Sequence, residues 1–234
     1  MTRPLTLLAL LALVCLPVSR VEAVPVGIET FDAAHDWVFG GGPGGQVPTP
    51  LGVQSGGGPG GASDPYLVVE ALGGNGPQSR LSAQNFGAWA GDYTGAGITQ
   101  VQGHVNNFGP EDVYLRLLFV EFGAMGPVNA ALTTVAVQVV AGSGWQPFVF
   151  DVLPSDLTVV IGSADAVLAN THEFRFFHNP SPFFAPGQMP PVTAVVGLDN
   201  LQAVADGSVP EPVSGLLLAA AGVAAFARRR GAAR

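Results

Sequence analysis

The segment 113–122, which reads VYLRLLFVEF, decides the fold class. It is made mainly of β-branched, aromatic and leucine residues, which favour extended structure. Its alternate positions are apolar and can share one face of a strand, namely Val113, Leu115, Leu117 and Phe119. The pattern predicts a β-strand with one face in a core.

Similar segments recur along the chain, separated by turn formers such as NNFGP at 106–110 and GSG at 142–144. The further predicted strands are 26–32, 66–71, 98–105, 133–140, 145–152, 173–178 and 193–204. Strands at this spacing predict an all-β sandwich or barrel. The segment 154–170 is ambiguous, with Ser155 or Ser163 able to cap a short helix. The Gly/Pro-rich segment 40–61 is predicted to be a long mobile loop.

The first 23 residues predict a signal peptide. Arg3 is followed by an apolar stretch, 5–18, and VEA at 21–23 places cleavage after Ala23. The alternative, a retained anchor helix, needs about 20 apolar residues. Cleavage would remove Cys15, the only cysteine, so the mature chain would have no thiol for a disulfide, a metal or catalysis.

The C-terminal end combines a Pro-Glu-Pro tripeptide, an uncharged apolar segment and a triple arginine. These are Pro210, Glu211 and Pro212, then 213–227, then Arg228, Arg229 and Arg230. The apolar segment predicts a single transmembrane helix, and the arginines would stay on the cytoplasmic side. An accidental hydrophobic tail is the alternative.

This order of elements resembles the PEP-CTERM sorting signal, which would cover 209–234. The resemblance implies an exported protein of a Gram-negative bacterium, processed by signal peptidase and by an exosortase. It would be anchored transiently in the inner membrane and then reach the cell surface or the extracellular matrix. Whether the tail is cleaved is left open.

Between these ends, 24–208 is predicted to form one domain. Outside the two targeting segments the chain has three arginines, fifteen acids and no lysine, a formal charge of −12. Because phosphate binding needs clustered basic residues, nucleic acid is excluded as a partner.

Three short motifs in this domain are FGAWAGDY at 86–93, LDNL at 198–201 and IETF at 28–31. They resemble segments of galactose-binding-like and laminin-B-like jelly rolls. The resemblance implies a jelly-roll-like β-sandwich that binds carbohydrate and holds a structural calcium ion between its first and last strands. The implied calcium ligands are Glu29 and Asp199, with Asp92 as a further candidate. Alternatively, Glu29 and Asp199 only bond backbone amides in turns.

A sugar-binding face needs exposed aromatic rings beside polar groups. Trp89 and Tyr93, set among glycines beside Asp92, are the best pair, and Trp37 is a third candidate. Trp145 is a fourth candidate, but it opens a strand after Gly144, and this position favours assignment to the core.

The remaining polar residues are given structural roles. His35, His104, His172 and His178 have no metal-type spacing. Arg116 and Arg175 lie in strands and are expected to pair with acids across the sheet, with binding of a polymer carboxylate as the alternative.

The chain has no G-x-S-x-G motif, no phosphate-binding loop with lysine and no nucleophilic cysteine once the signal peptide is removed. We therefore expect a non-enzymatic, surface-sorted protein that associates with extracellular polysaccharide. The first alternative is a structural biofilm or matrix protein without a defined ligand. The second is a secreted glycan hydrolase or lyase, with paired carboxylates such as Glu111 and Asp112.

Overall fold

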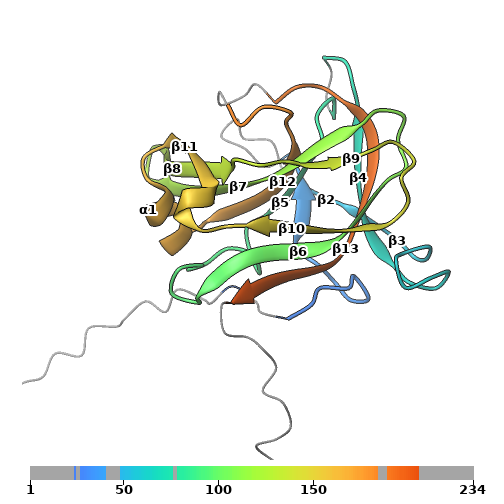
Figure 1. Cartoon of the computed structure of the whole chain (residues 1–234), viewed down its shortest axis with the longest axis horizontal. Helices are drawn as coiled ribbons and strands as arrows, with labels where there is room; N and C mark the ends of the chain where they lie inside the picture. Colours follow the sequence, from blue (N-terminus) through green and yellow to red (C-terminus); the bar gives the residue numbers. More distant parts are fainter. Residues whose placement is uncertain (1–23, 25–26, 41–47, 76–77, 184–188, 206–234) are drawn as a thin grey trace, which may run out of the picture.

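The structure, a computed structural model, describes residues 24, 27–40, 48–75, 78–183 and 189–205. Within these ranges the chain is built almost entirely of antiparallel β-strands, as the sequence predicts (Figure 1). The first seven strands are β1 (Trp37–Phe39), β2 (Thr49–Pro50), β3 (Gly52–Gln54), β4 (Tyr66–Leu72), β5 (Ser82–Asn85), β6 (Ile98–Asn107) and β7 (Val113–Gly123). The others are β8 (Gly126–Thr133), β9 (Val137–Val139), β10 (Gln146–Asp151), β11 (Leu157–Ile161), β12 (Glu173–His178) and β13 (Thr193–Ala205).

The strands form two sheets. The larger has the order β11-β8-β7-β12-β5-β1-β2, with β9 also paired to β7, and the smaller has the order β10-β6-β13-β4-β3. In both sheets, neighbours in space are often far apart in sequence, as in β6 beside β13 and β5 beside β12. This arrangement is a β-sandwich, and it confirms the predicted all-β fold class.

The two segments predicted to act in targeting, 1–23 and 209–234, lie outside the described residues, and so do the predicted signal helix and the predicted transmembrane helix 213–227. None of the helices in the described part of the chain has the length and apolar character needed to cross a membrane.

Several strand boundaries differ from the predictions. The segment 133–140 was predicted as one strand, but it holds the end of β8, a turn and the short β9. In the described part of 26–32, only Glu29 pairs with another strand residue, Leu201. The segment 40–61 is not one loop, because β2 and β3 pair with β1 and β4 within it.

A short helix, α1 (Ala164–Ala169), follows β11. Its N-cap is Ser163, whose Oγ accepts a hydrogen bond from the Ala166 N–H at 3.4 Å. A 3-10 turn at Pro154–Asp156 precedes β11. Of the two cap candidates, the structure selects Ser163 for the α-helix, and β11 lies between the 3-10 turn and this helix.

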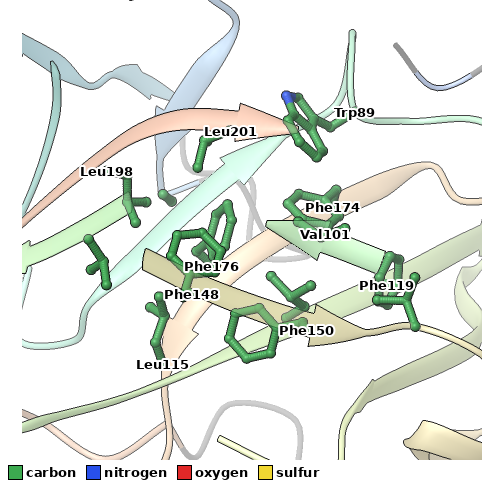
Figure 2. Packing of buried hydrophobic residues seen from close by; sticks show 14 of the residues in the cluster. Trp89, Val101, Leu115, Phe119, Phe148, Phe150, Phe174, Phe176, Leu198 and Leu201 are labelled. Atoms are coloured by element: carbon green, nitrogen blue, oxygen red, sulfur yellow. The ribbon is translucent and has the colours of Figure 1, made fainter. Parts of the chain in front are cut away.

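The main core lies between the two sheets, and its aromatic residues come from both of them (Figure 2). Phe174 and Phe176 of β12 meet at 5.3 Å between ring centroids, with their planes at 86°. Phe148 of β10, in the opposite sheet, contacts Phe176 edge-on at 5.8 Å. Such contacts add to the stabilisation from area burial. One face of the smaller sheet therefore packs against the core, and its other face points away from the core.

Candidate functional site

The three aromatic residues predicted to bind sugar lie in the core. Trp37, Trp89 and Tyr93 have exposed fractions of 0%, 1% and 0%. Trp89 packs against Phe174 at a centroid distance of 5.0 Å, and the Tyr93 hydroxyl donates to the Trp89 carbonyl at 2.9 Å. A buried ring offers no face to a sugar, so the predicted carbohydrate-binding set is wrong.

Glu29 is the hydrogen-bond acceptor for two buried tryptophans. Its Oε2 accepts hydrogen bonds from the Trp37 Nε1–H at 3.0 Å and from the Trp89 Nε1–H at 2.7 Å. An indole N–H buried without an acceptor would cost free energy, and one carboxylate oxygen satisfies both. Glu29 therefore serves as a tether for two core rings.

The predicted calcium set is not assembled. Glu29 is used by the tryptophans, and the Asp92 Oδ1 accepts from the Gly95 N–H at 2.6 Å in a local turn. In the described ranges, no group of three or more His, Cys, Asp or Glu side chains is arranged to hold a metal ion. Calcium binding by Glu29 and Asp199, with Asp92 as a further candidate, therefore stays a prediction.

Three of the four histidines make structural contacts to the backbone. The Nδ1 atoms of His35, His172 and His178 accept from backbone N–H groups at 3.2, 3.0 and 3.0 Å. Burial lowers the pKa of His178, which favours the neutral acceptor form. The buried Nδ1 of His104 has no hydrogen-bond partner.

Neither core arginine pairs with an acid across the sheet. Arg175 forms an ion pair with Glu173 on its own strand, and its Nε donates to Oε1 at 2.6 Å. Arg116 is buried and instead donates to four backbone carbonyls, those of Asn179, Thr133, Thr134 and Pro180. Burial lowers the pKa of its guanidinium.

The smaller sheet has a second side, which points away from the core. Along β6, β10 and β13, residues with inward side chains such as Val101, Phe148 and Leu198 belong to the core. The residues between them point outward because side chains alternate along a strand. We call this side the outer face, and its central residues are Gln100, Gln102, His104, Pro147, Val149, Asp151, Gly197, Asp199 and Gln202.

Amide side chains line one end of the outer face. The Gln102 Nε2 of β6 donates to the Gln202 Oε1 of β13 at 2.9 Å. Two residues before Gln102 on the same strand, the Gln100 Nε2 donates to the Asp151 Oδ1 of β10 at 2.8 Å. Cross-strand bonds of this kind hold planar donors and acceptors in fixed positions on a surface.

Three aromatic rings gather at the other end. The rings of Tyr66 and Phe108 stack at 5.6 Å, and Trp145 meets Tyr66 edge-on at 5.1 Å. Phe108 is 48% exposed and Trp145 is half-buried. We call Tyr66, Phe108 and Trp145 the aromatic cluster. The assignment of Trp145 to the core is therefore wrong.

The aromatic cluster sits over Gly197 of β13. A Cβ atom at this position would lie 2.7 Å from Trp145 Cη2 and 2.9 Å from Tyr66 Cδ2. The missing side chain lets the rings approach the sheet. A glycine inside a strand is a sequence signal for such an approach, and it could have located the cluster.

Asp199 lies between the amides and the aromatic cluster. Its side chain is fully buried, and neither carboxylate oxygen has a hydrogen-bond partner. Burial raises the pKa of Asp199 to about 7; the Asn200 N–H lowers this pKa, and the carboxyls of Asp64 and Asp32 raise it. The outer face thus combines aromatic rings, fixed amides and an unpaired acid.

Comparison with known proteins finds structural likeness only. No known family profile matches the chain, and no curated protein matches it. One similar structure is the family 11 carbohydrate-binding module from Clostridium thermocellum in complex with a β-1,3-1,4-mixed-linked tetrasaccharide (9% identity, 77% of this chain and 97% of that chain, TM-score 0.46). Another is an exo-β-agarase (10% identity, 78% of this chain and 25% of that chain, TM-score 0.49). At these TM-scores the likeness carries no argument about function.

Proposed function

We propose that this chain is an exported, non-catalytic protein that binds extracellular polysaccharide along the outer face of its smaller sheet. The observation that carries the proposal is the pairing of the aromatic cluster with the amides of Gln100, Gln102 and Gln202 on one surface. Sugar rings stack on aromatic faces, and their hydroxyls need fixed donors and acceptors. The outer face offers both.

The size of the face favours a polymer over a single sugar. From Gln100 to Asn106 along β6 is six residue steps, or about 20 Å at a strand rise of ~3.4 Å. The aromatic cluster lies at the Asn106 end, because Asn106 is paired with Gly197. A ligand that reached both the rings and the amides would have to be extended.

The proposal includes the address predicted from the ends of the chain. The signal peptide would carry the domain out of the cytoplasm, and the PEP-CTERM-like tail would be recognised by an exosortase. The domain would then meet polysaccharide at the cell surface or in the matrix. The high acidic charge and the lack of lysine fit a partner that is not a polyanion with phosphate groups.

The test is affinity electrophoresis of the full-length chain through gels containing the extracellular polysaccharide of the producing cell. We expect retardation of the native chain. Trp145→Ala and Gln102→Ala should each weaken binding by about tenfold, equivalent to ~1.4 kcal/mol. Met125→Ala, at a fully exposed position outside the outer face, is the matched control and should bind like the native chain.

Three results would contradict the proposal. Equal retardation of Trp145→Ala, Gln102→Ala and Met125→Ala would place binding elsewhere. Release of reducing sugar from the polysaccharide by the native chain would show a hydrolase. No retardation of any form would leave the matrix-protein alternative and remove polysaccharide binding for that polymer.

A further inference from the structure

Among the described residues, five strands pair with a neighbour on one side only, and β11 is the least protected of these edges (Figure 1). Natural edge strands are blocked against other chains by short length, proline or charge. β2 has two residues and ends in Pro50, β3 and β9 have three residues each, and β10 carries Pro147 and Asp151. β11, Leu157–Ile161, has five residues, and its sequence LTVVI contains neither proline nor charge.

The backbone of β11 directs hydrogen-bonding groups to its open side. The Asp156 carbonyl, just before the strand, accepts from the Thr134 N–H at 2.9 Å. Thr134 follows β8, so this carbonyl points toward β8, and the backbone groups of Thr158 do the same. Because the groups of successive residues in an antiparallel strand point to opposite sides, those of Leu157 and Val159 point away from β8. A further strand can pair with them.

Exposed apolar side chains lie along the same edge. Val159 and Ile161 of β11 are 47% and 45% exposed. Leu153 and Val135 are exposed near the start of the strand, where the bond between the end of β8 and the start of β11 places Val135. Exposed apolar groups that gather in one place mark surfaces that bind other chains.

β11 has one protective feature, a bulge between Val159 and Ile161. A bulge bends a strand and interrupts regular pairing. The regular part of the open edge is therefore Leu157–Val159, and a strand added there has to be centred on Thr158.

We propose that two copies of this chain pair through β11, antiparallel and about a two-fold axis at Thr158. Leu157 of each copy then lies opposite Val159 of the other, and the two residues exchange backbone hydrogen bonds across the open side. Asp156, the acid nearest the strand, lies opposite Val160 of the second copy and not opposite an acid. Like charges directly opposite each other would destabilise the pair.

Charge favours a second copy over another partner. Outside the two predicted targeting segments the chain has a formal charge of −12, so two copies repel each other over most of their surfaces. The uncharged β11 is an edge at which they can approach. It offers no charge that would select a basic or an acidic peptide, whereas a second β11 matches its apolar character.

The proposed dimer is weak and closed. Two strands of five residues bury less than the about 1,600 Å² of a standard interface, so dimerisation depends on concentration. A two-fold contact uses the edge of both copies, and assembly stops at two. The axis is perpendicular to the larger sheet, so both smaller sheets lie on the same side of it. Two outer faces would then meet one polysaccharide, a consequence that rests on the proposed function, whereas the dimer does not.

The first experiment is sedimentation of the full-length chain at rising concentration in a non-ionic detergent, without polysaccharide. We expect a monomer–dimer equilibrium for the native chain. Val159→Glu puts a charge on the edge of an acidic protein and should weaken dimerisation by about tenfold or more. Val140→Glu, at a position that is 49% exposed and lies just after β9, is the matched control and should dimerise like the native chain.

The second experiment tests the register by disulfide formation with oxidised glutathione, in a Cys15→Ser background that leaves no other cysteine. Across a non-hydrogen-bonded antiparallel pair the Cα atoms lie ~4.5 Å apart, within the range that a disulfide spans. Thr158→Cys should therefore form a linked dimer under conditions in which Val140→Cys stays monomeric. A native chain that is monomeric at every concentration, a dimer that Val159→Glu leaves intact, oligomers larger than two, or equal linkage of the two cysteine variants would each overturn the proposal.

Discussion

The interior of the sandwich and the outer face of its smaller sheet differ in how their ionisable groups are paired. In the interior, Glu29 accepts from two indole N–H groups, and Arg116 donates to four carbonyls. On the outer face, the buried oxygens of Asp199 and the Nδ1 of His104 have no partner. Two buried atoms of β5 in the larger sheet, Ser82 Oγ and Asn85 Nδ2, also lack a partner, so the difference concerns the ionisable groups and not every polar atom.

The aromatic residues show the same difference. Phe174 is fully buried and contacts Trp37, Trp89, Tyr93, Phe119 and Phe176. Phe108 is 48% exposed and contacts the other two members of the aromatic cluster. Truncating the first should affect stability, whereas truncating the second should mainly affect binding.

The largest expected effect is on the interior. Phe174→Ala should lower the free energy of unfolding by about 3–5 kcal/mol, because it leaves a cavity among aromatic rings. Phe108→Ala is the matched control, and its loss should stay below ~1 kcal/mol. Chemical denaturation of both variants measures the difference. Equal losses would mean that the aromatic cluster is a second core.

The next effect concerns the tether of the two tryptophans. Glu29→Ala should lower the free energy of unfolding by about 2–4 kcal/mol, since each unsatisfied buried N–H costs ~1–3 kcal/mol. Glu29→Gln keeps one acceptor oxygen and should lose less. Glu70→Ala, at an exposed position of β4, is the control. A Glu29→Ala variant as stable as Glu70→Ala would contradict the tether.

The third prediction is a pH dependence of stability that arises from Asp199 on the outer face. The pKa of Asp199 is raised to about 7, so between pH 4 and 7 the folded chain holds a proton that the unfolded chain has released. This group should therefore lower stability as pH rises across that window, by at most about 1.4 kcal/mol per pH unit, and no further above it.

Chemical denaturation at a series of pH values measures this slope. Asp199→Asn should remove the contribution. If Asp199→Asn kept the native slope between pH 4 and 7, the titrating group would be another residue.

The smallest expected effect on stability comes from Gly197→Ala. Its Cβ would lie within 3.1 Å of all three rings of the aromatic cluster, so the rings must move outward. Overpacking costs about 1–3 kcal/mol of stability. Because exposed rings are free to move aside, we expect a cost at the lower end of that range. Polysaccharide binding should fall more than stability does. Ala203→Gly, at an inward position of the same strand, is a stability control for β13.

The sequence predicted the sheets better than the site for a physical reason. The strands β7, β12 and β13 have dense apolar patterns, and each formed where expected. The alternation of side chains within a strand is local. Whether Trp89 is buried depends on Glu29, which lies 60 residues away, and no local pattern contains that contact.

The outer face was missed for a related reason. Phe108 lies in a predicted turn, Trp145 opens a strand, and Tyr66 starts another, so their meeting depends on the order of strands in the smaller sheet. Gly197 was the local signal of a close approach. Asp199 was found through a motif, but its burial without a hydrogen-bond partner depends on the packing around β13, which no local pattern contains.

The most direct test of the central claim uses the three tryptophans as reporters. Trp37 and Trp89 lie in the interior and Trp145 lies on the outer face. We predict that extracellular polysaccharide shifts the tryptophan fluorescence of the native chain and of Trp89→Phe, and that Trp145→Phe shows no shift. A shift that persisted in Trp145→Phe would contradict the assignment of the outer face as the binding surface.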